Sequence, residues 1–144
     1  MTIAAALAGG FAFVAPARAQ DEDGGTHASK PDVRKEVVAV IEAQLTAFRA
    51  GELKKAYSFG AAALRAQTPL RAFVAIVQNN YPEILANTRA EFGLVRDDGQ
   101  RATVRVHVFA KDADAPYDYV LVKERAGWRI SGVLPHRAAG ADRL

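Results

Sequence analysis

The chain has 144 residues, 50% of them hydrophobic and 24% charged, which fits a single globular domain. Its 19 lysines and arginines against 16 acidic residues give a net charge of +3, too small and too scattered an excess to indicate nucleic-acid binding. The absence of cysteine excludes disulfides, zinc–thiolate sites and a thiol nucleophile. The three histidines lack the spacing of a metal-binding pair, so we predict no metal and no cofactor.

Residues 1–19 are apolar and rich in small side chains, and they end in Ala17-Arg18-Ala19 before Gln20. This pattern is typical of a secretory signal peptide cleaved between Ala19 and Gln20. The apolar run is shorter than the ~20 residues that cross a bilayer. We therefore expect an exported protein, placed in the bacterial periplasm after cleavage, that does not span the membrane.

Two segments flank the predicted domain. Residues 20–31 are acidic and then rich in glycine and serine, which predicts a flexible leader. Residues 136–144 are predicted to be a disordered tail. The domain itself is expected to run from residue 32 to residue 135.

A long amphipathic helix is predicted from Asp32 to Ala50. Apolar residues recur at helical spacing along it, and Gly51 provides a stop. Gln44 falls in the middle of the apolar stripe, where an unpaired amide costs ~1–3 kcal/mol. It is interpreted either as a structural glutamine bonded to backbone or as a polar group that faces a pocket.

Further helical segments follow as far as residue 80. Residues 52–67 are amphipathic, but Gly60 interrupts the pattern and predicts two short pieces. The next helix begins near Pro69 and ends near Asn80, because Pro82 cannot continue it without losing a hydrogen bond.

From residue 87 onward the period of the pattern changes to two, which predicts antiparallel strands. Strands are expected over residues 90–95, 101–109, 116–124 and 128–134. His107 falls on the polar face of the second strand, where a surface role is favoured over that of a general base. In the last strand, the alternation places four residues on one face: Trp128, Ile130, Gly132 and Leu134. Helices followed by such strands make an α+β domain with the helices on one face of the sheet.

Three segments carry a resemblance to a known family. "IEAQLTAFRAGELKKAYSFGAAALR", "LRAFVAIVQNNYPEI" and "GWRISGV" resemble the bacterial domain-of-unknown-function 4864 family over about residues 32–134. The resemblance implies a fold like that of nuclear transport factor 2, a cone of about three N-terminal helices packed on a curved four-stranded antiparallel sheet. It implies no activity. The residues that match the family pattern include Gln44, Phe73, Tyr81, Tyr119 and Trp128.

The favoured function is a non-catalytic module that binds a small apolar ligand or a protein partner. An apolar pocket with a few polar groups is a usual ligand site. The candidate cavity residues are Gln44, Tyr57, Tyr81, Tyr119 and Trp128.

Two alternatives remain open. An isomerase- or dehydratase-type enzyme would need a carboxylate inside the cone, and Asp118 could serve only if it pointed inward. A purely structural envelope protein would use the basic sheet face, with Arg101, Arg105 and Arg129, to contact an anionic surface or to form a homodimer.

Overall fold

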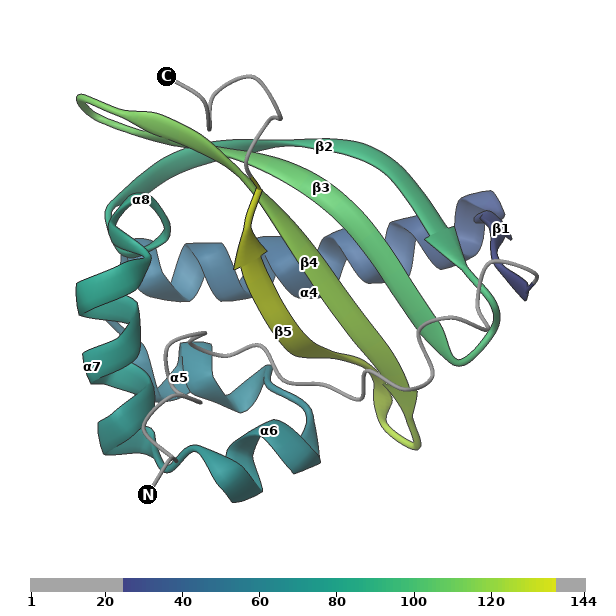
Figure 1. The fold of residues 1–144 in the computed structure, drawn as a ribbon, viewed down its shortest axis with the longest axis horizontal. Helices are drawn as coiled ribbons and strands as arrows, with labels where there is room; N and C mark the ends of the chain where they lie inside the picture. The colour runs from purple at the N-terminus through teal and green to yellow at the C-terminus, as the bar shows by residue number, and fades with distance from the viewer. Residues whose placement is uncertain (1–24, 137–144) are drawn as a thin grey trace.

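The computed structural model describes residues 25–136, which form one antiparallel sheet with helices on one of its faces (Figure 1). The sheet has five strands in the order β1-β2-β3-β4-β5, so that each strand pairs with its neighbour in sequence. The described elements in chain order are β1 (His27–Ala28), α4 (Pro31–Arg49), α5 (Leu53–Ser58), α6 (Ala62–Gln67), α7 (Leu70–Asn80), α8 (Pro82–Leu85), β2 (Asn87–Asp97), β3 (Arg101–Ala110), β4 (Asp114–Glu124) and β5 (Gly127–Pro135). The α+β class predicted from the sequence is confirmed.

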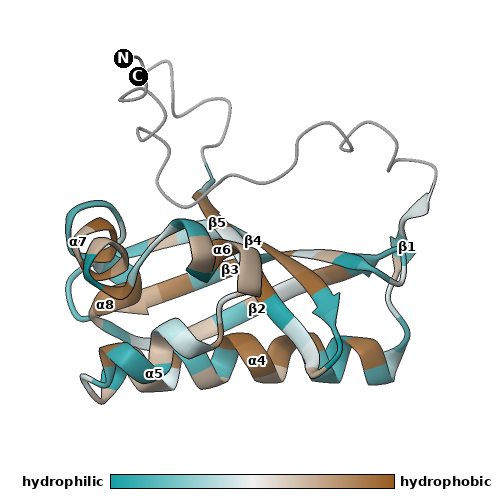
Figure 2. Cartoon of the chain, turned by 90° about the horizontal axis from the view of Figure 1, so that it is seen from below, coloured by the Kyte–Doolittle hydropathy of each residue, from teal (hydrophilic) through white to brown (hydrophobic). Residues whose placement is uncertain are grey.

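Helix α4 lies along the sheet and closes the core from one side (Figure 2). Its buried stripe contains Val37, Ile41, Leu45 and Phe48, as the sequence spacing predicts. The hydropathy colours of Figure 2 show apolar segments along the helix on its sheet side. The inner face of the sheet therefore packs against the buried stripe of this helix.

The prediction of about three helices is wrong, because five helices lie within residues 25–136. The predicted break at Gly60 is real and separates α5 from α6. A Cβ at Gly60 would lie 3.2 Å from the Tyr57 carbonyl oxygen, so glycine suits this close turn. Pro82 ends α7 and then begins the short helix α8, since proline fits the first helical position.

The four-stranded sheet predicted from the sequence is also incomplete, because β1 adds a fifth strand at its edge. His27 and Ala28 pair with Asp97 and Arg96, and the Ser29 amide donates to the Val95 carbonyl oxygen at 2.8 Å. The Ser29 hydroxyl donates to the carboxylate of Asp97, a residue that is 4% exposed. The described end of the predicted leader is therefore fixed to the sheet, while residues 1–24 lie outside the described part of the chain.

The alternation predicted for β3 and β4 is confirmed. Ala102, Val104, Val106 and Val108 are buried on the helix side, and so are Tyr117, Tyr119 and Leu121. The turn from β2 to β3 places Gly99 at a φ of 94°, a conformation that favours glycine. The backbone amides of Gln100 and Arg101 donate to Asp98 and hold the pKa of its carboxyl below the ordinary value.

The face predicted for the end of β5 is wrong. The pairing of β4 with β5 shifts between Val120 and Leu121, so Ser131 interrupts the alternation as a bulge. Trp128 and Ile130 are buried as predicted, but beyond the bulge Val133 is buried and Leu134 is 40% exposed. Ser131, expected on the outer face, is 7% exposed.

Residues outside the sheet form hydrogen bonds with backbone groups on the unpaired edge of β5. The Ala61 amide donates to the Ile130 carbonyl oxygen at 2.8 Å, and the Ile130 amide donates to the Phe59 carbonyl oxygen at 2.9 Å. Further along, the Tyr81 hydroxyl donates to the Val133 carbonyl oxygen at 2.6 Å. These contacts cover backbone groups that would otherwise be available for pairing with another strand.

Candidate functional site

Two places could hold a partner: the space between the helices and the sheet, and the outer face of the sheet. The predicted cavity residues Gln44, Tyr57, Tyr81, Tyr119 and Trp128 belong to the helices and to the inner face of the sheet, and Tyr119 also borders the hollow on the outer face. The structure does not bring them together around one space.

Gln44 is 5% exposed, and its side-chain amide donates to the Ala56 carbonyl oxygen at 3.0 Å. That contact ties α4 to α5, as expected for the structural interpretation. The Tyr57 hydroxyl donates to the Thr68 carbonyl oxygen at 2.8 Å and to the Arg65 carbonyl oxygen at 3.0 Å. The Tyr57 ring packs against the Phe73 ring. Both polar groups are therefore satisfied by backbone.

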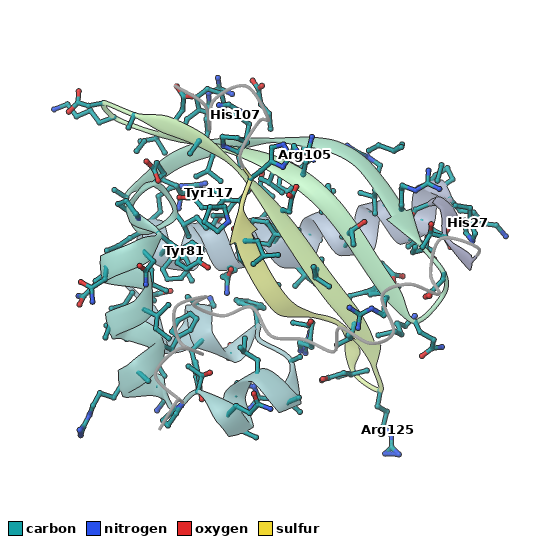
Figure 3. All side chains as sticks on the ribbon, viewed as in Figure 1. His27, Tyr81, Arg105, His107, Tyr117 and Arg125 are labelled. Atoms are coloured by element: carbon teal, nitrogen blue, oxygen red, sulfur yellow. The ribbon has the colours of Figure 1, made fainter. Side chains whose placement is uncertain are left out.

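The tyrosines of β4 gather with Tyr81 at one end of the core, as Figure 3 shows for Tyr81 and Tyr117. The rings of these two residues lie 5.7 Å apart, and the Tyr117 hydroxyl donates to Glu83 Oε1 at 2.5 Å. Burial raises the pKa of Tyr117, and the Glu83 carboxylate raises it further. Sequence reasoning missed Glu83, because nothing in its local pattern indicates a tyrosine partner from a strand 34 residues away.

Tyr119 and Trp128 fill the core but leave a polar atom without a partner. Tyr119 is 0% exposed and Trp128 is 2% exposed. Within residues 25–136, the Tyr119 hydroxyl and the Trp128 indole nitrogen have no hydrogen-bond partner. Burial also raises the pKa of Tyr119, and the neighbouring Tyr81 adds to this effect.

These contacts predict opposite results for two tyrosine-to-phenylalanine changes. Tyr81→Phe leaves the buried Val133 carbonyl oxygen unpaired and should cost about 1–3 kcal/mol of unfolding free energy. Tyr119→Phe removes an unpaired hydroxyl and should cost nothing or stabilise the fold by up to about 1 kcal/mol. Urea denaturation of both variants measures the difference. A loss for Tyr119→Phe as large as for Tyr81→Phe would show that its hydroxyl has a partner, such as a buried water.

The space between α7 and β5 is nearly filled. A cavity of about 10 Å³ lies among Gln44, Phe48, Phe73, Tyr81 and Ile130, with Leu64, Val77, Ile84, Gly132 and Val133 completing its wall. This volume suits one water molecule at most, whereas ligand pockets occupy ~300–1,000 Å³. A ligand could enter only if these side chains moved apart.

The outer face of the sheet carries a shallow hollow with a volume of about 770 Å³. We call it the outer groove, and it is lined by Glu91, Phe92, Gly93, Leu94, Arg96, Thr103, Val104, Arg105, His107, Asp118, Tyr119 and Val120. Leu94 is 63% exposed in its wall. The pairing of β2 with β3 shifts between Phe92 and Val95, and this bulge sets Leu94 outside the regular alternation.

Charged side chains beside the outer groove form pairs with one another. Arg105 Nε lies 3.0 Å from Asp118 Oδ1, and His136 Nδ1 lies 2.9 Å from Asp118 Oδ2. His107 Nε2 lies 2.8 Å from Asp114 Oδ1. Asp118 thus points outward and not into the core. It does not supply the inward carboxylate that the alternative hypothesis of an isomerase- or dehydratase-type enzyme would need. Figure 3 shows Arg105 and His107 together on this part of the sheet.

The described residues provide little for a metal centre. Within residues 25–136, no group of three or more histidine, aspartate or glutamate side chains is arranged to hold a metal ion. Among the same residues, no helix is long and apolar enough to cross a membrane.

Fold and surface together define a small α+β protein whose antiparallel sheet is covered by helices on one face and hollowed on the other. The family model described as "Domain of unknown function (DUF4864)" matches residues 30–142, and the chain belongs to this family. No similar protein is found among curated proteins or among solved structures.

Proposed function

We propose that the protein is an exported, non-catalytic binding module that pairs with a second copy of itself through the outer groove. The observation that carries this proposal is Leu94, a leucine that is 63% exposed in the wall of the outer groove. A small apolar ligand is the less favoured occupant, because the inner cavity has a volume of only about 10 Å³.

The exposed apolar residues support this choice of face. Within residues 25–136, Leu94 and Leu134 are the large hydrophobic residues that are exposed. Leu134 pairs with Asp118 across β4 and β5, so both leucines belong to the face that the helices leave uncovered. Exposed apolar side chains gathered on one face indicate a protein interface more readily than scattered ones.

The charges of the outer groove favour a second copy of this chain, rather than a strongly charged molecule, as the binding partner. The Asp118 carboxylate offsets Arg105, and Glu91 lies 2.8 Å from Arg89. Two such faces can approach each other without bringing large like charges together, and a two-fold interface uses the same patch twice.

The wider fold family and the location are part of the same proposal. A sheet with a helix-covered inner face and paired antiparallel strands is compatible with the cone of nuclear transport factor 2. Export is supported by the apolar segment that ends at Ala17-Arg18-Ala19. A periplasmic location would follow from cleavage before Gln20.

The test is the oligomeric state of the chain from Gln20 to Leu144. Light scattering coupled to size exclusion, over a dilution series, should show a monomer–dimer equilibrium. Leu94→Asp buries a charge at the interface and should raise the dimer dissociation constant at least about a hundredfold, the equivalent of about 3 kcal/mol.

Ala39→Asp is the matched control, since Ala39 is exposed on α4 away from the outer groove. It should leave the dissociation constant unchanged. A wild-type chain that stays monomeric at the highest concentration would overturn the proposal, and so would equal weakening by both variants.

A further inference from the structure

Within residues 25–136, one end of the sheet carries four arginines that form no ion pair. We call it the arginine end, and it consists of Arg96, Arg101, Arg125 and Arg129. Arg96 and Arg101 flank the turn from β2 to β3, while Arg125 lies in the turn from β4 to β5 and Arg129 follows it. Figure 3 shows Arg125 at the tip of its turn, pointing away from the molecule.

Backbone pairing brings these arginines to one edge. The Lys123 amide donates to the Gln100 carbonyl oxygen at 2.8 Å, so the two turns lie side by side. Arg101 pairs with Val122, and Val122 pairs with Arg129 on its other side. Arg101 and Arg129 therefore lie in one row across the sheet, about 10 Å apart at their backbones, and share a face.

The arginine end lacks ion pairs such as that of Arg105 with Asp118, and Arg96 belongs both to this end and to the outer groove. Within residues 25–136, none of the four arginines forms an ion pair. Arg96 contacts the Thr26 carbonyl oxygen at 3.3 Å, and Arg129 donates to the Trp128 carbonyl oxygen at 3.0 Å. Asp98 is the carboxylate near Arg101: the amides of Gln100 and Arg101 donate to its Oδ1 oxygen, and the Arg101 charge further lowers its pKa without forming an ion pair.

We propose that the arginine end binds the surface of a membrane that contains anionic phospholipids. Guanidinium groups form paired hydrogen bonds with phosphate oxygens, so arginine suits a phospholipid headgroup. The four arginines lie in or beside two adjacent turns, and only Arg96 lines the outer groove. This spread matches an extended charged surface better than a single small anion. Trp128 stands among them but is only 2% exposed, so it offers no ring for stacking on nucleic-acid bases.

The test is co-sedimentation of the chain from Gln20 to Leu144 with vesicles. Phosphatidylcholine vesicles that contain phosphatidylglycerol should bind the protein at ~0.1 M salt and release it at ~1 M salt. Vesicles of phosphatidylcholine alone should not bind it. Removing one arginine should weaken binding about fivefold, and R101Q/R125Q/R129Q should weaken it about a hundredfold.

The control K54Q/K55Q/R71Q removes the same charge from exposed positions on α5 and α7 and should bind as the wild type does. R101K/R125K/R129K keeps the charge but loses the paired hydrogen bonds, so it should bind more weakly than the wild type and more tightly than R101Q/R125Q/R129Q. Equal loss in the control would overturn the proposal, because net charge alone would then explain binding. The proposal would also be overturned if the wild type did not bind anionic vesicles, or if it bound duplex DNA as tightly as it binds those vesicles. Circular dichroism confirms that each variant is folded.

Discussion

Replacing Asn87 with alanine should lower the free energy of unfolding by about 3 kcal/mol. Asn87 is 2% exposed, at the junction of α8 and β2. Its amide nitrogen donates to the Leu45 carbonyl oxygen at 3.0 Å and to the Ile84 carbonyl oxygen at 2.8 Å, and its oxygen accepts from Arg49 Nε at 2.9 Å. Alanine removes all three hydrogen bonds at this buried position, and a buried polar group that loses its partner costs about 1–3 kcal/mol.

Two further variants separate lost hydrogen bonds from lost volume. Asn87→Asp keeps the shape but turns a carboxylate toward two carbonyl oxygens, so it should destabilise at least as much as alanine. Asn79→Ala, at an exposed position of α7, should change stability by less than about 0.5 kcal/mol. Urea denaturation measures all three, and an Asn87→Ala loss no larger than that of Asn79→Ala would contradict the prediction.

Alkaline solution should unfold the protein through two buried tyrosines. The pKa values of Tyr117 and Tyr119 are raised in the folded state, mainly by burial, while an unfolded tyrosine titrates near ~10. The unfolded chain therefore loses these protons first as the pH rises. The stability that they support is complete below about pH 10 and is lost above it.

The loss can reach about 1.4 kcal/mol per pH unit for each of these tyrosines. Two pH units above 10 could thus remove about 5 kcal/mol, a large part of the stability of a small domain. Unfolding free energies from urea titrations between about pH 9 and 12 should show this slope. The double variant Y117F/Y119F cannot ionise at these positions and should have a distinctly smaller slope. An unchanged slope would mean that other groups, such as the exposed lysines, dominate alkaline unfolding.

Much of the fold was predictable because it depends on periodic patterns within single segments. The spacing of Val37, Ile41 and Leu45 predicts the buried stripe of α4, and the structure confirms it. The alternation from Ala102 to Val108 predicts the inner face of β3 equally well. Such patterns follow from the geometry of one helix or one strand and need no knowledge of the neighbours.

The errors in the fold occur where a distant segment decides the conformation. The segment with His27 and Ala28 lacks the apolar pattern of a strand, yet the open edge of β2 pairs with it. The bulge at Ser131 depends on how β5 pairs with β4, and a shift of one residue moves the following side chains to the other face. Neither feature leaves a signal in the local sequence.

The candidate site shows the same limit. Gln44 was recognisable as a polar residue on an apolar stripe, but its partner, the Ala56 carbonyl oxygen, is known only from the packing of α4 on α5. Leu94 and the outer groove were not predicted, because a bulge in β2 places that side chain in solvent.

By itself the sequence determined that this protein is an α+β domain with amphipathic helices and alternating strands, since hydrophobic spacing is a local property. Tertiary structure decided that the inner cavity has a volume of only about 10 Å³ and that a hollow of about 770 Å³ lies on the outer face. The physical reason is that cavity volume, strand register and the pairing of buried polar groups depend on contacts between segments distant in the chain. Only the folded chain therefore shows that the interior is closely packed and that the helices leave the outer face uncovered.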